Sequence, residues 1–293
     1  MEINQLIDLN KLKFDKFYNN LLEAKLDKSV LAKAMKYSSI KGGKRIRAFL
    51  VSQASQIVGL SNINSMIISS SIESIHSYSL IHDDLPCMDN DSVRRGKPST
   101  HIKFGEASAV LAGSSLLTLA FEIIADKKYL INSKMKNEIV RFLAISSGHT
   151  GIAGGQELDL KFENKKKQIN QIIEMQKKKT GKLFNFCLYA VGVIANKKRE
   201  EKLFLSNLGE EIGLLFQLAD DFLDKKGSKK ILGKPVKKDN KKGKSTLLNL
   251  MGEKKAYLYA NNLKKKILRK LEKHGKKAKD LINTIKFILE RKF

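Results

Sequence analysis

The sequence predicts an all-α fold, a bundle of helices in a single domain, and three observations support that prediction. Its 293 residues include only three prolines, and apolar residues recur at three- and four-residue steps while few segments alternate with period two. Three stretches, 63–82, 107–124 and 183–195, are apolar on nearly every face, as expected of helices at the centre of a large bundle. Neither an internal repeat nor a linker rich in proline or serine divides residues 1–293, so one domain is the simplest prediction.

The apolar periodicity places the helices in order along the chain. They are expected at 3–26, 29–37, 44–59, 63–85, 105–125, 134–148, 168–194, 198–223, 244–251, 253–273 and 276–290. The amphipathic stretch 253–273 would belong to an outer layer around the apolar helices. Glycine and lysine gather in the loops at 41–44, 94–98 and 225–244, so polar chemistry is expected at helix ends around an apolar interior.

The chain is strongly basic, with 56 Lys and Arg against 30 Asp and Glu and a formal net charge of +26. Clustered cations can bind nucleic acid by releasing counterions from its phosphates. The lysines of this chain are scattered, however, and form no base-reading motif with interleaved aromatic residues. We therefore expect a solvated basic surface and no specific nucleic-acid partner.

Three features predict a cytoplasmic protein. The cysteines, Cys87 and Cys187, lie in no CxxC or Cys/His pattern and are too few for a disulfide framework, which suits a reducing compartment. Residues 1–6 lack the basic start and apolar run of a secretion signal. The longest uncharged stretch, 107–121, is shorter than the roughly 20 apolar residues that span a bilayer, so we expect a buried core helix there and no transmembrane segment.

Two clusters of aspartates, each inside an apolar stretch, are the strongest functional signal. Asp220, Asp221 and Asp224 fall within ADDFLD, and the four-residue spacing puts Asp220 and Asp224 on one face of a helix, with Gln217 one turn earlier. Carboxylates gathered in this way need a counter-charge. Mg²⁺ takes oxygen ligands and is commonly completed by water and substrate phosphates, so two such clusters predict a phosphorylated ligand bound between them.

The first cluster, Asp83, Asp84 and Asp89, needs a break in its helix to act as one site. Six residues advance about 240° around a helix, so an unbroken helix would point Asp83 and Asp89 apart. Pro86 lies between them and interrupts helical hydrogen bonding. We expect the helix to end near Asp84 or Leu85 and a loop to return Asp89 to the side of Asp83.

Basic residues accompany both clusters and would bind phosphate. Lys44 and Arg47 are three apart at a predicted helix start, after a pair of glycines that either admits an anion to the backbone N–H groups or serves as a common helix cap. His76 precedes Asp83 by two helical turns on about the same face, where it either reaches the site or packs in the core. The other candidates are Arg94, Arg95, Lys179, Thr180 and Lys234.

Taken in order, these motifs resemble those of the trans-prenyltransferases that make short-chain isoprenyl diphosphates. The resemblance rests on GGKRIR at 42–47, IESIH ending at 76, SLIHDDLPCMDND at 79–91, RRGKPSTH at 94–101, GGQELDL at 154–160, KTGKLF at 179–184, FQLADDFLD at 216–224 and GKST at 243–246. It covers nearly the whole chain and is strongest to the bacterial farnesyl diphosphate synthases, which share the two-residue expansion of the first acidic motif. It implies an orthogonal helical bundle of the isoprenoid synthase type around a deep central cavity, usually as a homodimer.

The resemblance also implies roles for individual residues and three Mg²⁺ ions in each active site. The implied metal ligands are Asp83 and Asp89 with Asp84 in support, and Asp220, Asp221 and Asp224 for the third ion. The implied contacts to the allylic diphosphate are Arg94, Lys179, Thr180, Gln217 and Lys234, and those to isopentenyl diphosphate are Lys44, Arg47, His76 and Arg95. Lys179 and Lys234 would stabilise the departing pyrophosphate together with the metal, so the reaction needs no side-chain nucleophile or general base.

The length of the product would be set on the helix that carries the first acidic cluster. Tyr78 lies five residues before Asp83 and is followed by Ser79, and a ring about one turn, or 5.4 Å, below the metals would stop a growing chain early. We therefore expect farnesyl diphosphate, made from isopentenyl diphosphate and dimethylallyl or geranyl diphosphate. If Tyr78 only packs in the core, geranyl and geranylgeranyl diphosphate are the alternatives.

Some positions depart from the family pattern without removing a predicted ligand. They are Ala48 in place of a usual proline, Ser92 in place of a common acid, the lysines of 225–230 beside the second cluster, and Leu247 and Leu248 after GKST. These leave the metal affinity, the order of the lid segment 225–244 and the catalytic efficiency open.

Three other functions also stay open. A terpene cyclase would share the first cluster but needs no second diphosphate site such as 42–47. A non-catalytic subunit that binds prenyl diphosphates has no need of intact acids, and a basic nucleic-acid or membrane binder would show salt-sensitive binding without turnover.

Overall fold

The structure is a computed structural model that describes residues 2–40, 42–129, 131–165, 167–226 and 246–290. It confirms the all-α prediction, since the only sheet in the described part of the chain is a short hairpin of two strands with two residues each, β1 (Val93–Arg94) and β2 (Lys97–Pro98). The α-helices are α1 (Ile3–Lys25), α2 (Val30–Ser39), α3 (Ile46–Val58), α4 (Asn62–Asp83), α5 (Thr100–Phe104), α6 (Glu106–Ala125), α7 (Ser133–Ser147), α8 (Ile152–Phe162), α9 (Ile169–Gln176), α10 (Lys182–Ile194), α11 (Arg199–Lys226), α14 (Leu247–Met251), α15 (Glu253–Glu272) and α16 (Lys279–Glu290). A π-helical segment, Lys177–Gly181, joins α9 to α10, and a 3₁₀ turn, Gly275–Ala278, precedes α16.

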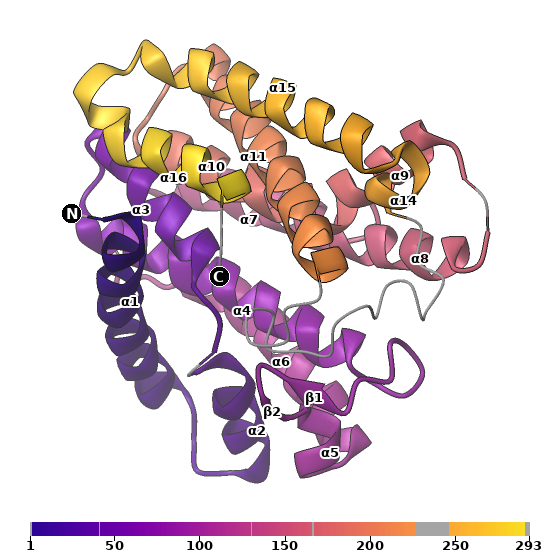
Figure 1. Cartoon of the computed structure of the whole chain (residues 1–293). Helices are drawn as coiled ribbons and strands as arrows, with labels where there is room; N and C mark the ends of the chain where they lie inside the picture. Colours follow the sequence, from indigo (N-terminus) through magenta and orange to yellow (C-terminus); the bar gives the residue numbers. More distant parts are fainter. Residues whose placement is uncertain (1, 41, 130, 166, 227–245, 291–293) are drawn as a thin grey trace.

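Two helices form the centre of the bundle. α4 packs against α3, α6 and α10, and α10 packs in turn against α3, α7 and α11. α15 and α16 cover one side and α1 and α2 another, as Figure 1 shows. The predicted central position of 63–82 and 183–195 and the outer position of the amphipathic stretch 253–273 are therefore confirmed.

α4 is buried although serine is frequent in it. The hydroxyls of Ser70 and Ser74 donate to the carbonyls four residues earlier, at 2.8 Å each, so they enter the core with their hydrogen bonds made. Ser71 donates instead to the carbonyl of Ala120 on α6, at 2.8 Å. The bond from Ser71 joins α4, whose end carries the first acidic cluster, to α6.

α6 has one buried and one exposed face. It is long and apolar enough to cross a membrane by length and composition alone, and 44% of its apolar window is buried inside the fold. Val110 and Leu111 are exposed, at 43% and 56%. The prediction of a core helix is therefore right for one face only, because the opposite face of α6 has no neighbour among the described residues.

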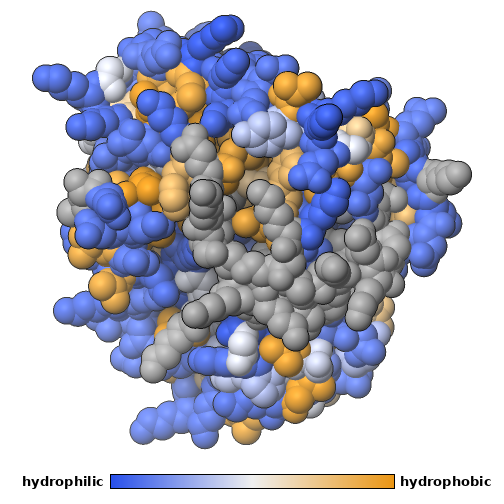
Figure 2. All heavy atoms as spheres, viewed as in Figure 1, coloured by the Kyte–Doolittle hydropathy of each residue, from blue (hydrophilic) through white to orange (hydrophobic). Residues whose placement is uncertain are grey.

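Hydrophilic side chains make up most of the coloured surface in Figure 2, with small apolar patches between them. This distribution agrees with a net charge of +26 carried mainly on the surface. Many cations also pair with acids, such as Lys25 with Glu122 at 2.7 Å. Exposed pairs of this kind contribute little to stability.

The structure differs from the predicted elements in three places. The hairpin at 93–98 and the short α5 were not predicted, and GGQELDL lies inside α8, which the helical periodicity missed. The continuous helix expected at 168–194 is interrupted by the π-helical segment. The physical reason is a close approach of α8, where a Cβ on Gly155 would lie 2.2 Å from the backbone nitrogen of Lys179.

Candidate active site

The loop after α4 brings the first acidic cluster together. The helix ends at Asp83, and the N–H of Asp89 donates to the carbonyl of Asp83 at 2.8 Å. The N–H of Asp91 donates to the carbonyl of Asp84 at 3.1 Å, and Asn90 adopts the left-handed conformation that the reversal requires. The break expected from Pro86 and the return of Asp89 beside Asp83 are both confirmed.

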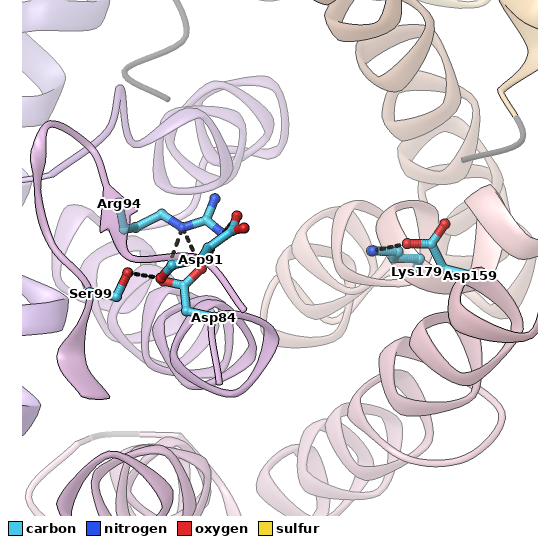
Figure 3. A network of polar contacts seen from close by, with 6 residues as sticks. All are labelled: Asp84, Asp91, Arg94, Ser99, Asp159 and Lys179. Carbon is cyan, nitrogen blue, oxygen red and sulfur yellow. Dashed lines mark hydrogen bonds and ion pairs between the residues drawn. The ribbon is translucent and has the colours of Figure 1, made fainter. Parts of the chain in front are cut away.

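Asp84 faces Arg94 in this loop. The Nε of Arg94 lies 3.0 and 3.1 Å from the two carboxylate oxygens of Asp84, one Nη of Arg94 also contacts that carboxylate, and Asp91 lies 3.5 Å away. Figure 3 shows the three side chains in one cluster. Asp84 is 2% exposed, and this burial raises the pKa of its carboxyl group although Arg94 opposes the shift. Asp84 therefore orients Arg94 in this structure, whereas its expected support of a metal ion stays a prediction.

The hairpin sends the two adjacent arginines in different directions. Arg95 and Gly96 both have positive φ, at 54° and 75°, and form the tight turn between β1 and β2. While Arg94 contacts Asp84, Arg95 lies against the glycine pair before α3, where a Cβ on Gly42 would be 2.5 Å from the Cδ of Arg95. The glycines therefore make room for a side chain, which the sequence did not predict.

A group of cationic and imidazole side chains lies beside this glycine pair. Burial lowers the pKa of Arg95 to about 10, with a further contribution from the charge of Arg45. Burial also lowers the pKa of Arg47, whose guanidinium carbon is 5.0 Å from the centre of the Phe184 ring. The Nε of Arg47 is buried and has no hydrogen-bond partner within the described ranges. These groups are suited to binding an anion.

His76 belongs to the same group. Its pKa is held well below 6.5 by burial first, and then by the charges of Arg47 and Arg95. The imidazole is therefore neutral at physiological pH. Lys44, the remaining member of the predicted set, is exposed.

Asp221 of the second acidic cluster is held by amide side chains. On α11, the Nε2 of Gln217 donates to Asp221 at 2.9 Å, and the hydroxyl of Thr180 donates to the Oε1 of Gln217 at 3.0 Å. Gln176, the last residue of α9, donates to the other oxygen of Asp221 at 3.3 Å. Sequence reasoning missed Gln176, whose only signal is its place three residues before the KTG motif.

Lys179 lies in the π-helical segment and contacts α8. Its Nζ is 2.6 Å from Asp159, a nearly buried carboxylate in the GGQELDL motif that was not among the predicted site residues. In Figure 3 the Lys179–Asp159 pair lies opposite the Arg94 cluster, with the ammonium and guanidinium groups directed toward each other. Arg94 and Lys179, which the family resemblance assigns to one diphosphate, thus face each other across the site.

The two acidic clusters lie on helices that share a neighbour. α4, which ends at Asp83, and α11, which carries Asp220, both pack against α10. Their C-terminal ends point toward the same end of the bundle in Figure 1. Arg47 on α3 and Asp220 are close enough for the carboxylate to raise the pKa of the guanidinium, against the larger effect of burial. The predicted juxtaposition of carboxylates and cations is consistent with this arrangement.

The donor set of the site fits Mg²⁺. In the ranges that the structure describes, no three His, Cys, Asp or Glu side chains lie close enough to enclose a metal ion by themselves. Mg²⁺ does not need such a cage, because it is commonly held by one or two carboxylates, water and substrate phosphates. Asp83 and Asp89, brought together by the loop, supply such oxygens. The described residues do not include Lys234, the rest of the segment 227–244, or most of GKST. The last residue of that motif, Thr246, caps α14 by accepting from the N–H of Asn249 at 3.2 Å.

Tyr78 and Ser79 lie where a limit on product length was expected. The ring of Tyr78 is half-buried on α4 and meets His82 edge-on, with centroids 5.3 Å apart. Burial raises the pKa of Tyr78, and the charge of Asp83 adds to the shift. Ser79 donates to the carbonyl of His76 at 3.0 Å and so points back along the helix.

Comparison with known proteins gives a consistent result. Residues 28–285 match the family model described as polyprenyl synthetase. The farnesyl diphosphate synthase of Bacillus subtilis is 39% identical over 256 residues, which cover 86% of this chain and 82% of that protein. The crystal structure of an FPP/GFPP synthase from Zymomonas mobilis has a TM-score of 0.87 at 34% identity and covers 98% of both chains. A geranyltransferase from Helicobacter pylori, solved in complex with magnesium and isoprenyl diphosphate, has a TM-score of 0.83 at 30% identity over 99% of this chain and 97% of that one. The resemblance read from the sequence motifs is confirmed, and the chain belongs to the polyprenyl synthetase family.

Proposed function

We propose that this chain is a Mg²⁺-dependent short-chain trans-prenyltransferase that condenses isopentenyl diphosphate with dimethylallyl or geranyl diphosphate to form farnesyl diphosphate. The observation that carries the proposal is the presence of two chemically different anion sites. Arg94 lies within the electrostatic reach of Asp83, Asp84 and Asp89, whereas Arg95 lies mainly among other arginines, Arg45, Arg94 and Arg47. The first arrangement suits a diphosphate chelated by metal, and the second suits a diphosphate bound by cations.

The allylic diphosphate would bind between the two acidic clusters. We assign three Mg²⁺ ions to Asp83, Asp84, Asp89, Asp220, Asp221 and Asp224. Mg²⁺ bound there would stabilise the negative charge that develops on the leaving pyrophosphate. Arg94 and Lys179 would bind the same phosphate oxygens from opposite sides, since their charged groups are directed toward each other. Thr180 and Gln217 would contact the substrate from the hydrogen-bond network that also holds Asp221. We assign Lys234 to the same diphosphate from its position in the sequence alone.

Isopentenyl diphosphate would occupy the group formed by Lys44, Arg47, His76 and Arg95. Its double bond attacks the allylic carbon as the C–O bond to pyrophosphate breaks, and the proton lost afterwards passes to the released pyrophosphate. Phe184 packs under the guanidinium of Arg47 and is fully buried. It would help to keep water from the allylic cation that develops as the C–O bond breaks. None of the groups in this site has to act as a nucleophile.

Tyr78 would end the growing chain. Its ring lies about one helical turn from Asp83, and its edge-on contact with His82 restricts its rotation. Ser79 is the neighbouring position whose size would tune the limit. A product of fifteen carbons follows from this stop, whereas geranylgeranyl diphosphate would require Tyr78 to move aside.

We further propose that residues 1–293 form one catalytic domain that works as a homodimer in the cytoplasm. One contiguous core, reaching from Phe14 to Ile288, supports the single domain. The exposed apolar face of α6, with Val110 and Leu111, is suited to burial against a second copy. Both cysteines are free thiols, which suits a reducing compartment.

A product assay tests this proposal against the other functions. Labelled isopentenyl diphosphate is supplied with dimethylallyl or geranyl diphosphate, with and without Mg²⁺, and products are separated by chromatography. We expect metal-dependent formation of farnesyl diphosphate. Release of hydrocarbon from geranyl diphosphate alone would indicate a cyclase, binding without turnover would indicate a non-catalytic subunit, and salt-sensitive retention of DNA or anionic lipid without turnover would indicate a basic surface binder.

A further inference from the structure

Arg45 differs from the other cations of the GGKRIR motif in its conformation and burial. It is the residue that immediately precedes α3, and its backbone is left-handed, with φ 53° and ψ 40°. A residue with a side chain rarely adopts that conformation unless its surroundings fix it. Arg45 is also only 3% exposed, whereas its neighbour Lys44 is exposed. Something in the fold therefore holds this arginine in place.

Three helices supply the contacts that hold it. The Nε of Arg45 is 2.8 Å from Asp15 on α1, and one Nη is 2.9 Å from Glu73 on α4. The other Nη donates to the carbonyl of Ser39 at the end of α2. The guanidinium also lies over the ring of Phe14, at 5.4 Å. The planar fork of one arginine thus joins α1, α2 and α4 to the turn that starts α3.

The charge of Arg45 is balanced, unlike that of its neighbours. Burial lowers the pKa of its guanidinium, but Glu73 and Asp15 outweigh that effect and the net pKa is raised. The pKa values of Arg47 and Arg95 are instead lowered, even though Glu73 lies near both. Glu73 is 2% exposed and hydrogen-bonds only Arg45 among the described contacts. Arg45 is therefore neutralised by the protein, while Arg47 and Arg95 keep their capacity for an anion.

We propose that Arg45 is a positioning residue for the isopentenyl diphosphate site, an assignment that rests on the function proposed above. Its contacts with Asp15, Glu73 and the carbonyl of Ser39 lock the left-handed turn from which Lys44 and Arg47 reach the substrate. Arg45 itself does not touch the substrate. A lysine at position 45 could carry the charge but could not bond to three acceptors in fixed directions, so it would leave the turn free to move.

The test compares Arg45→Lys with Lys36→Arg as a matched control. Lys36 forms an exposed ion pair with Glu23, at 3.3 Å, between α2 and α1, so the control also exchanges one cation for another between helices. We expect Arg45→Lys to raise the KM for isopentenyl diphosphate at least about tenfold, which corresponds to about 1.4 kcal/mol of binding free energy. Its kcat and its KM for geranyl diphosphate should stay within about twofold of wild type, and Lys36→Arg should change none of the three constants.

A second variant keeps the test decisive if Arg45→Lys does not fold. Asp15 is 22% exposed and makes only one of the three polar contacts, so Asp15→Asn should keep the fold and raise the KM for isopentenyl diphosphate about threefold. Folding of each variant is checked by circular dichroism and urea denaturation. An unchanged KM for isopentenyl diphosphate in the folded variant, or equal increases in both KM values, would overturn the positioning role. Absence of condensation by the wild-type enzyme would instead reject the proposed function, and the role of Arg45 with it.

Discussion

His76 should make the stability of the folded protein depend on pH. Its imidazole lies on α4, where burial and the charges of Arg47 and Arg95 hold its pKa well below 6.5. The unfolded chain takes up a proton at this histidine below about pH 6.5, whereas the folded chain keeps the ring neutral. Because the unfolded state then binds more protons, the free energy of unfolding falls as the pH falls below that value.

The size of this effect follows from the linkage relation. Each pH unit below 6.5 lowers the free energy of unfolding by up to about 1.4 kcal/mol for as long as the folded ring stays neutral. Going from about pH 7.5 to about pH 5 should therefore remove up to about 2 kcal/mol through this one group. That is a large part of the roughly 5–15 kcal/mol by which a domain is usually stable.

The assay is urea denaturation of the wild type and of His76→Gln at a series of pH values, followed by circular dichroism. All other titrating groups are common to the two proteins, so the difference between their free energies of unfolding isolates His76. We expect that difference to be constant above about pH 7 and to shift by up to about 2 kcal/mol, in favour of the variant, by pH 5. Parallel curves for the two proteins over the whole range would refute the reasoning, since they would mean that the folded and unfolded states protonate His76 equally.

Three further predictions follow from the packing of the site. Tyr78→Ala should lengthen the product by at least one isoprene unit, and unchanged C15 output on chromatography would remove Tyr78 from that role. Asp84→Asn should lower the free energy of unfolding by about 3 kcal/mol, because it removes the nearly buried carboxylate that pairs with Arg94. Urea denaturation measures this loss, and a value below about 1 kcal/mol would contradict the prediction. Gly155→Ala should lower the free energy of unfolding by about 1–3 kcal/mol despite the better helix propensity of alanine, because the new Cβ would lie 2.2 Å from the backbone nitrogen of Lys179. Equal or greater stability of the variant in urea would show that α8 can shift without loss.

The end of α4 shows how far local sequence rules reach. Pro86 and the six-residue spacing of Asp83 and Asp89 were sufficient to predict both the break in the helix and the return of the second carboxylate. The four-residue spacing of Asp220 and Asp224 likewise placed them correctly on α11. These features depend on the backbone of a few consecutive residues, so the sequence contains all the information that they need.

The contacts of α8 show where such rules stop. Gly154 and Gly155 disfavour a helix by about 1 kcal/mol each, and propensity alone argues against α8. The absence of a side chain on Gly155 is what allows α8 to approach the π-helical segment, where Asp159 then meets Lys179 at 2.6 Å. That benefit exists only after two segments distant in the sequence have packed. A single-sequence argument therefore could not find the helix, the π-helical segment or the Lys179–Asp159 pair.

The arginines of the site show how contacts that depend on the fold separate residues that look alike in the sequence. Arg45, Arg47, Arg94 and Arg95 are equivalent in a list of charges, and only the fold decides which of them receives a carboxylate of its own. Arg45 and Arg94 do, and the pKa of each is raised. Arg47 and Arg95 are only partly exposed, and burial lowers the pKa of each, so their charge is less stabilised by the protein than that of Arg45 or Arg94. Under the proposed function, the paired arginines would supply geometry, and the two whose charge is less balanced would supply the free energy that favours an anionic substrate.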